Sequence, residues 1–228
     1  MKETFHAVAI DGPSGAGKST LARNVAQRLH FLYVDTGAIY RSIGWYALSK
    51  EAAPDDAQAV AALLKDLHIA VRYGEYGLQH MIVNDRDVTD EIRLPEVSAA
   101  ASKVAAIPAV RAYLLEMQRA LAREHDVIMD GRDIGTVVLP DAGCKIFLTA
   151  SAEVRARRRC KELEERGTPC AYEDVLEDMR RRDAMDRSRA IAPLKQAEDA
   201  VLLDTSELTF EESCTALQQL IEETIHAS

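Results

Sequence analysis

The sequence predicts an α/β fold, in which a parallel sheet is covered by helices. Short apolar segments rich in strand-forming residues alternate with helical patterns along the chain, an order typical of parallel sheets. Residues 12–19 read Gly-Pro-Ser-Gly-Ala-Gly-Lys-Ser, a phosphate-loop motif, between an apolar strand segment and a helical pattern. Turns rich in Asp, Gly and Arg follow the strand segments. Because ligands bind at the carboxyl ends of parallel strands, these turns predict the position of the site.

The first quarter of the chain contains two predicted strands. Residues 5–10 form a buried strand and residues 31–34 a shorter one, which ends at Asp35-Thr36-Gly37. Helical spacing of apolar residues predicts helices over 19–30, 38–50 and, after a break at Pro54, 55–67.

Residues 68–94 have a different character. Three short β-like segments, 68–73, 78–83 and 86–88, are separated by turns at Gly74/Gly77 and Asn84-Asp85. This pattern predicts a small antiparallel insert that is not part of the parallel sheet.

The remainder of the chain returns to alternating strands and helices. Proline at a first-turn position begins each of two helices, and Thr209 with Glu212 forms a capping box before the last helix. The predicted strands are 126–129, 144–148 and 200–203, and the predicted helices are 95–106, 108–124, 151–166, 171–185 and a final helix after Thr209.

Composition narrows the class of protein. The length of 228 residues and the 47% hydrophobic content suit one large domain, or one core with a lid and an insert. No segment is apolar enough to span a bilayer and no secretory signal opens the chain, so we expect a cytoplasmic protein without membrane contact. The cysteines, Cys144, Cys160, Cys170 and Cys214, are scattered, so neither a disulfide framework nor a zinc site is expected.

The charge distribution is uneven. The net charge of −9 argues against a general nucleic-acid partner. Half of the arginines, however, lie in residues 155–189. We interpret this stretch as a local site for small polyanions, although neighbouring glutamates make a solvated, ion-paired helix face the alternative for its individual arginines.

The phosphate loop predicts a nucleoside triphosphate. Its backbone N–H groups form an anion nest, which the N-terminus of the next helix reinforces. Lys18 would reach the β- and γ-phosphates, and Ser19 would supply a hydroxyl to Mg²⁺.

Arginines at the strand ends favour phosphoryl transfer, because a planar guanidinium pairs bidentately with phosphate oxygens. Arg41 and Arg132 each follow a predicted strand. Asp130 ends an apolar strand and is a candidate for orienting Mg²⁺, directly or through water, with a cap or turn role as the alternative. Asp133 could accept hydrogen bonds from an exocyclic amine, or could be the salt-bridge partner of a nearby arginine.

Other classes of site are not indicated. The histidines show no metal spacing, there is no hydrolase elbow, and the guanine-binding motif N-K-x-D is absent. Two alternatives remain. One is a related small-molecule kinase acting on UMP, AMP or an alcohol, and the other is a non-catalytic nucleotide-binding switch.

Several segments, in order, resemble bacterial cytidylate kinases. They are Ile-Asp-Gly-Pro-Ser-Gly-Ala-Gly-Lys-Ser at 10–19, Asp-Thr-Gly-Ala-Ile-Tyr-Arg at 35–41, Asp-Gly-Arg-Asp-Ile-Gly-Thr-Val-Val at 130–138, and Arg-Asp-x-x-Asp-Arg-x-Arg-x-x-x-Pro-Leu at 182–194. The resemblance implies a P-loop three-layer fold with a parallel five-stranded sheet, the antiparallel insert and an Arg-rich lid. It also implies phosphoryl transfer from MgATP to CMP or dCMP, giving ADP and the diphosphate, within pyrimidine metabolism. The protein would be a monomer.

The resemblance also divides the chain. One domain over 1–228 would contain a core (about 1–35, 125–150 and 190–228), a CMP-binding region with the insert (about 36–124) and a lid (about 155–170).

Site residues follow from the matched motifs. Lys18, Arg132, Arg158 and Arg189 would be catalytic, with Arg158, alone or with Arg155 or Arg159, reaching ATP from the lid. The ATP loop would comprise Gly12, Pro13, Ser14, Gly15, Ala16, Gly17, Lys18, Ser19 and Thr20, and either Ser19 or Thr20 could provide the Mg²⁺ hydroxyl. On the acceptor side, Arg41, Arg132 and Arg189 would hold the phosphate, Thr36 and Tyr40 would line the pocket, Ser102, Arg111 and Asp133 would read the base, and Arg182 and Asp186 would hold the sugar.

Overall fold

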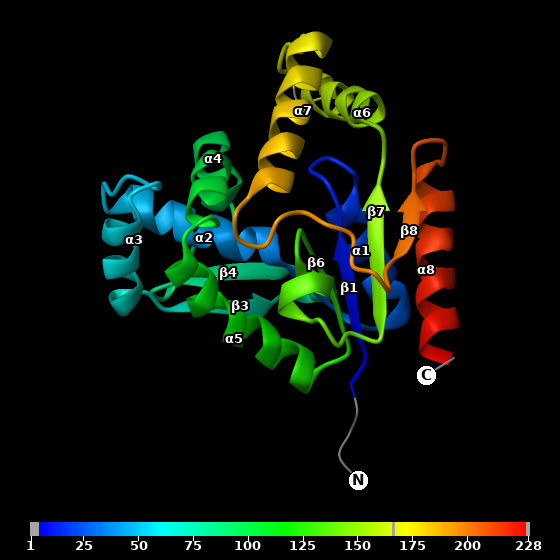
Figure 1. Cartoon of the computed structure of the whole chain (residues 1–228), viewed down its shortest axis with the longest axis horizontal. Helices are drawn as coiled ribbons and strands as arrows, with labels where there is room; N and C mark the ends of the chain where they lie inside the picture. The colour runs from blue at the N-terminus through cyan, green and yellow to red at the C-terminus, as the bar shows by residue number, and fades with distance from the viewer. Residues whose placement is uncertain (1–4, 166, 227–228) are drawn as a thin grey trace.

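The computed structural model describes residues 5–165 and 167–226. In this part of the chain the main sheet has five strands in the order β2-β6-β1-β7-β8 (Figure 1). All four strand pairs are parallel, as the alternation of strands and helices predicts. The strands are β1 (Ala7–Asp11), β2 (Leu32–Asp35), β6 (Val127–Gly131), β7 (Cys144–Thr149) and β8 (Val201–Asp204).

The strand register brings acidic residues together at the carboxyl ends of the strands. Asp11 ends β1 opposite Gly131, and Asp35 ends β2 opposite Asp130. Since β1 lies at the centre, the loop that follows Asp11 emerges between the ends of β6 and β7. This is the position at which open parallel sheets bind ligands.

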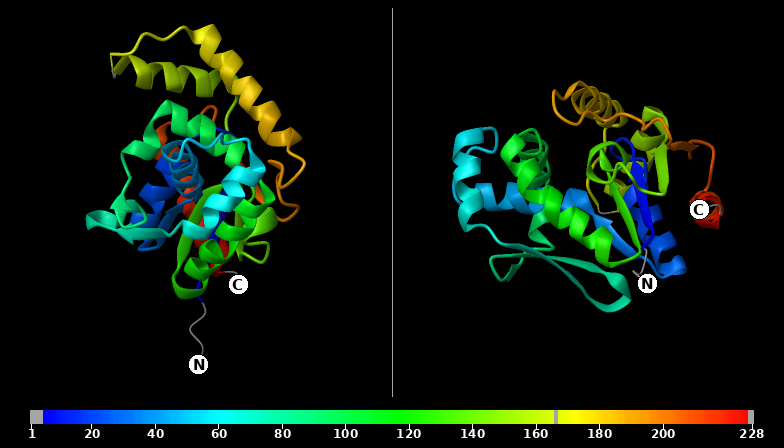
Figure 2. Two further views of the ribbon diagram at one scale, coloured as in Figure 1. Left: turned by 90° about the vertical axis from the view of Figure 1, so that its left-hand side faces the viewer. Right: turned by 60° about the horizontal axis from the view of Figure 1, so that its bottom comes forward.

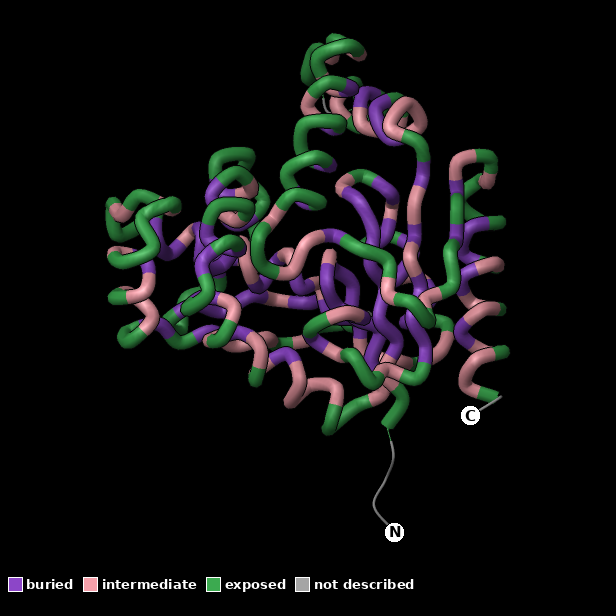
Figure 3. The backbone as a smooth tube through the Cα atoms, viewed as in Figure 1, coloured by how far each residue is buried: buried purple, intermediate pink, exposed green. Residues whose placement is uncertain are grey.

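Helices cover both faces of the sheet. Val8 and Ile10 point to one face and pack with α1 (Lys18–Leu29) and α8 (Phe210–His226), whereas Ala9 between them belongs to the core on the other face. That second core includes residues of α2 (Thr36–Ser49), α3 (Ala57–Leu63), α4 (Pro95–Val104) and α5 (Pro108–Glu124). Figure 3 shows the resulting buried band through the centre of the molecule.

The insert is a three-stranded antiparallel sheet, as its pattern predicts. It consists of β3 (Ile69–Tyr73), β4 (Gln79–Val83) and β5 (Arg86–Asp87). Asn84 and Asp85, which connect β4 to β5, both have positive φ, at 45° and 65°, as a tight hairpin turn requires. In the right-hand view of Figure 2 the insert lies below α2 and α5.

Two consecutive helices, α6 (Ala152–Glu165) and α7 (Tyr172–Ser188), project above the carboxyl ends of the strands (Figures 1 and 2). The predicted end of the first helix, Arg166, lies outside the described residues. A disulfide joins Cys160 to Cys170 with their Cα atoms 5.4 Å apart, so the prediction that the cysteines stay unpaired is wrong for these two. Cys170 lies in the segment between α6 and α7, where the chain turns back towards Cys160, and the spacing in the sequence contains no signal of this proximity.

Smaller differences concern helix ends and short turns. The predicted helix over 55–67 ends at Leu63 and continues as a 3₁₀ turn, Leu64–Asp66. Further 3₁₀ turns, Glu75–Gly77 and Glu91–Arg93, and a wide helical turn, Ile134–Val138, were not predicted. The capping box is confirmed, because Thr209 N–H and Glu212 N–H each bond to the other residue's side chain, at 2.8 and 3.3 Å. Among the described residues, no helix is both long and apolar enough to cross a membrane.

Candidate active site

The phosphate loop connects β1 to α1, and its glycines are sterically required. Gly15 and Gly17 have positive φ, at 74° and 87°, which favours glycine. Gly12 has a φ of 154°, and a Cβ there would lie 1.9 Å from the carbonyl oxygen of Leu148. The loop therefore holds a conformation that leaves its backbone close to the strand ends.

Lys18 begins α1 and is buried. Its Nζ donates a hydrogen bond to the Pro13 carbonyl at 2.8 Å, so the side chain folds back across the loop. Burial, followed by the positive charge of Arg132, lowers the pKa of Lys18 to about 7. A phosphate bound in the loop would favour the charged ammonium again.

Ser19 and Asp130 form the part of the site suited to Mg²⁺. Ser19 Oγ donates to Asp130 Oδ2 at 2.9 Å, and Tyr33 Oη donates to Asp130 Oδ1 at 2.9 Å. Burial and the nearby charge of Asp35 raise the pKa of Asp130 to about 6. Thr20 instead lines a separate pocket that Phe210 also lines, so the geometry fits Ser19 better than Thr20.

These oxygen donors fit Mg²⁺, which usually takes one or two protein oxygens and completes its shell with waters and substrate phosphates. Within residues 5–165 and 167–226, no group of three or more His, Cys, Asp or Glu side chains could hold a metal by itself.

Asp11 is a site residue that the sequence analysis missed. Its carboxylate accepts hydrogen bonds from the N–H groups of Ile134 and Gly135, at 2.7 and 2.8 Å. Burial raises the pKa of Asp11 to about 6, although these two hydrogen bonds act to lower it. Asp11 thus holds the helical turn that follows Asp133 against the start of the phosphate loop.

Three of the predicted acceptor-side residues form one ion-paired group. Asp186 Oδ2 pairs with Arg132 Nε at 2.8 Å, and Asp186 Oδ1 pairs with Arg189 Nη2 at 2.6 Å. Asp186 is buried near the end of α7, while Arg132 follows β6. The carboxylate therefore holds two guanidinium groups near Lys18, whose pKa responds to both Arg132 and Asp186.

Three predicted base-pocket residues lie together beside this group. Arg111 of α5 forms an ion pair with Asp133, the alternative that the sequence left open for that carboxylate. The Arg111 guanidinium also lies 5.9 Å from the centre of the Tyr40 ring. Burial raises the pKa of Asp133, an effect that Arg111 opposes, and burial raises the pKa of Tyr40 to about 12.

The start of α2 holds two more predicted residues. Thr36 Oγ1 donates to the Asp130 carbonyl at 2.7 Å, which connects β2 to β6, and Arg41 Nη2 pairs with Asp35 Oδ2 at 2.9 Å. Ser102 is exposed on α4, where its hydroxyl bonds within the helix to the Ser98 carbonyl at 3.5 Å. The structure therefore gives Ser102 no contact with Arg111 or Asp133 that supports its predicted role.

Two predicted residues lie elsewhere. Arg158 donates to the carbonyl and hydroxyl oxygens of Thr205, at 2.7 and 3.3 Å, beyond the end of β8 rather than at the phosphate loop. Arg182 is exposed on α7, where it pairs with Asp178 at 2.8 Å and not with Asp186. Helical periodicity could not reveal which neighbouring element each of these side chains meets.

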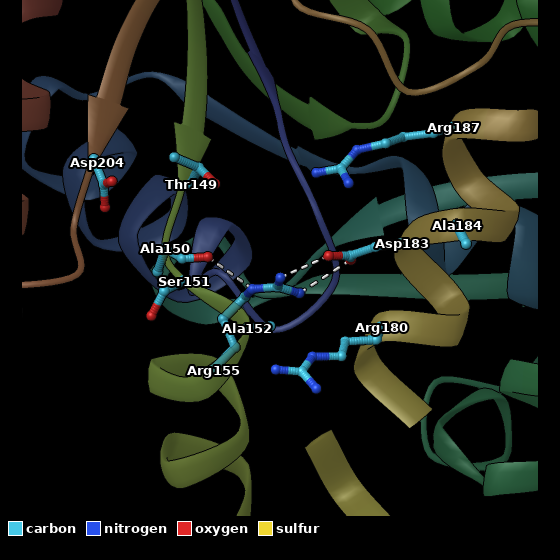
Figure 4. A pocket seen from close by; sticks show the side chains of 10 residues that line it. All are labelled: Thr149, Ala150, Ser151, Ala152, Arg155, Arg180, Asp183, Ala184, Arg187 and Asp204. Atoms are coloured by element: carbon cyan, nitrogen blue, oxygen red, sulfur yellow. Dashed lines mark hydrogen bonds and ion pairs between the residues drawn. The ribbon is translucent and has the colours of Figure 1, made fainter. Parts of the chain in front are cut away.

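A pocket lies between the ends of β7 and β8 and the helices α6 and α7 (Figure 4). Arg155 lines this pocket and is buried. The guanidinium donates to the carbonyls of Ala150 and Ser14, both at 2.9 Å, and bidentately to Asp183 at 2.6 and 3.0 Å. Arg180 and Arg187 extend from α7 into this pocket (Figure 4). Among the lid arginines, Arg155 rather than Arg158 thus contacts the phosphate loop.

Comparison with known proteins shows the family of this chain. The sequence profile described as cytidylate kinase matches residues 8–223. The chain belongs to the cytidylate kinase family. It is 48% identical over 214 residues to the cytidylate kinase of Carboxydothermus hydrogenoformans, covering 94% of this chain and 96% of the relative. It is 49% identical over 218 residues to the cytidylate kinase of a Geobacillus species, covering 96% and 97%.

One solved structure supports the fold. The chain resembles a crystal structure of an uncharacterized protein from Eubacterium ventriosum with a TM-score of 0.53 at 11% identity, covering 95% of this chain and 98% of the other. Membership of the cytidylate kinase family makes the chain an ATP-dependent phosphotransferase with nucleotide substrates. The predictions of the family, the fold class and a nucleoside-monophosphate kinase are thereby confirmed.

Proposed function

We propose that the protein transfers the γ-phosphate of ATP to CMP or dCMP. The observation that supports this most is the meeting of two sites at Lys18. Lys18 belongs to the phosphate loop, and the ion-paired group of Arg132, Asp186 and Arg189 comes close enough for the charges of Arg132 and Asp186 to shift the pKa of Lys18. Phosphoryl transfer requires such an arrangement, because donor and acceptor phosphates must meet in line.

The reaction is a displacement at phosphorus. An anionic oxygen of the CMP phosphate attacks the γ-phosphorus of ATP, and the bond from that phosphorus to the β–γ bridging oxygen breaks, leaving ADP. Because the attacking oxygen is already ionised, no general base is needed. Lys18, Arg132 and Arg189 balance the charge of the transferring group, and Arg41 holds the acceptor phosphate.

The pair Arg111–Asp133 suits cytosine. Cytosine presents an amino donor at N4 and an acceptor at N3, and uracil reverses both. Asp133 would accept from N4 while Arg111 donates to N3, with Tyr40 and Thr36 lining the pocket. UMP would leave both charged groups without matched partners. Ser102 would have to turn towards the base to take part.

Mg²⁺ would be held by Ser19, with Asp130 directly or through water. Bound there, the ion would neutralise charge on the donor phosphates. The remaining loop residues (Gly12, Pro13, Ser14, Gly15, Ala16, Gly17 and Thr20) would hold ATP through their backbone.

On the donor side we propose Arg187 in place of Arg158 as the arginine that reaches ATP phosphates, because it extends into the pocket beside the loop (Figure 4). Asp186 would contact the CMP sugar, while Arg182 could do so only by leaving Asp178. We propose that the domain consists of a core (about 1–35, 125–150 and 190–228), a CMP-binding region (about 36–124) and a lid (about 155–170).

The cellular setting is part of the proposal. We infer a monomer without a nucleic-acid partner that acts in cytoplasmic pyrimidine metabolism. The location is inferred from where ATP and CMP are found, because the Cys160–Cys170 disulfide does not favour a reducing compartment.

Initial rates of ADP release across CMP, dCMP, UMP, AMP and shikimate test the proposal. CMP or dCMP should give the highest kcat/KM. Faster turnover of another acceptor would identify a different small-molecule kinase. ATP binding without turnover of any acceptor would identify a nucleotide switch.

A further inference from the structure

Gln79, the first residue of β4, connects the insert to the acceptor side of the site. Its Oε1 accepts a hydrogen bond from the N–H of Asp35 at 2.7 Å, and its Nε2 donates to the carbonyl of the same residue at 3.3 Å. The Nε2 group also contacts Met81 Sδ at 3.1 Å, and the side chain is buried, with 8% of the residue exposed. One amide therefore satisfies both main-chain groups of Asp35.

This contact compensates for the position of β2 in the sheet. The only strand beside β2 in the described main sheet is β6, so its other edge offers main-chain groups that need partners. A primary amide has one donor group and one acceptor oxygen, which lets it imitate a neighbouring strand. Gln79 does so at the last residue of β2.

Asp35 is the residue through which this contact affects the site. One carboxylate oxygen accepts from the N–H of Ala38 at 2.8 Å and caps α2, and the other pairs with Arg41 at 2.9 Å. Asp35 and Arg41 both pack closely against Gly37, because a Cβ on Gly37 would lie 3.0 Å from Asp35 Oδ1 and from Arg41 Nη1. The orientation of the Arg41 guanidinium therefore depends on where the Asp35 backbone is held.

We propose that Gln79 is a positioning residue for the acceptor phosphate, and that the insert acts on catalysis through it. Gln79 fixes Asp35, Asp35 fixes Arg41, and Arg41 meets the phosphate of CMP. This inference rests on the proposed function, in which Arg41 binds that phosphate. It gives the antiparallel insert a role in substrate affinity and not only in the fold.

Steady-state kinetics of the full chain test the inference. Gln79→Met keeps the length of the side chain and removes the amide. The KM for CMP should rise about tenfold, the effect of losing one well-placed polar contact, while the KM for ATP stays within about twofold. An unchanged KM for CMP, or an equal rise in both KM values, would overturn the inference.

The matched control is Thr89→Val. Thr89 Oγ1 accepts from the Met81 N–H at 2.9 Å, so this isosteric change removes a hydrogen bond in the same insert without touching Asp35. It should leave the KM for CMP unchanged. A rise like that of Gln79→Met would show that the insert matters only through its overall stability, against the inference.

A double-mutant cycle with Arg41→Ala separates positioning from a general structural effect. If Gln79 acts through Arg41, adding Gln79→Met to Arg41→Ala should raise the KM for CMP no further. Multiplication of the two effects would overturn the inference. If Gln79→Met does not fold, Gln79→Glu replaces it. This variant keeps the acceptor for the Asp35 N–H and lacks the donor. The same cycle then applies, with an expected rise of about threefold in the KM for CMP.

The two proposals fail differently. If the unmodified protein releases no ADP in response to CMP, the proposed function is wrong. If it does, and the cycle is multiplicative, only the role of Gln79 is wrong.

Discussion

The ion pair between Arg155 and Asp183 should be the strongest single contact between α6 and α7. Both side chains are almost fully buried, at 3% and 8% exposed, and they share two hydrogen bonds. Asp183→Ala would leave the Arg155 guanidinium buried without its counter-charge, which typically costs about 3–5 kcal/mol. For a chain of this length we expect the midpoint of thermal unfolding to fall by roughly 10 °C.

Glu153→Gln is the control, because Glu153 pairs with Arg180 at 2.7 Å between the same two helices but on the surface. Solvent screens that pair, so its removal should leave the unfolding midpoint almost unchanged. Circular dichroism measures the free energy of unfolding of both variants in urea and their midpoints of thermal unfolding. Equal losses, or a loss under about 1 kcal/mol in Asp183→Ala, would refute the reasoning. The double variant Arg155→Met/Asp183→Leu should recover much of the stability, since no buried charge remains.

Four further outcomes follow from the site. Asp133→Asn should reduce the CMP/UMP ratio of kcat/KM by about tenfold or more, and an unchanged ratio would contradict its role in reading the base. Arg187→Ala should lower kcat by about 10³-fold and Arg158→Ala by far less, with the opposite ranking restoring Arg158 as the lid arginine. Ser19→Ala should raise the Mg²⁺ concentration needed for half-maximal rate, and an unaltered requirement would point to Thr20. The pKa of Lys18 is lowered to about 7, so the amine becomes neutral in the free protein as the pH rises above 7, and ATP binding must then take up a proton. Equilibrium binding between pH 7.5 and 9 should accordingly weaken by up to about tenfold per pH unit, and a flat profile would exclude this assignment.

The main elements could be predicted from the sequence because local patterns determine them. Residues 108–124 are helical as predicted, and the insert and the capping box are confirmed. The phosphate loop was recognisable because its glycines and Lys18 are consecutive. Its geometry depends on a few adjacent φ values, which the motif encodes directly.

Contacts between distant elements could not be predicted. Arg155 and Arg158 are three residues apart on α6, yet the first bonds to the phosphate loop and the second to Thr205. Periodicity identifies the face of a helix but not the element that covers it. Asp11 and Gln79 escaped notice for the same reason, since each acts on main-chain groups far away in the sequence.

Asp183 and Asp186 lie one turn apart on α7. One is connected to the ATP loop and the other to the arginines of the acceptor side. Asp183 binds Arg155, which donates to the Ser14 carbonyl of the ATP loop, while Asp186 binds Arg132 and Arg189. A rotation or shift of this helix on binding one nucleotide must therefore alter the cavity for the other. Thermodynamic reciprocity then requires that ATP change the affinity for CMP by the same factor by which CMP changes the affinity for ATP.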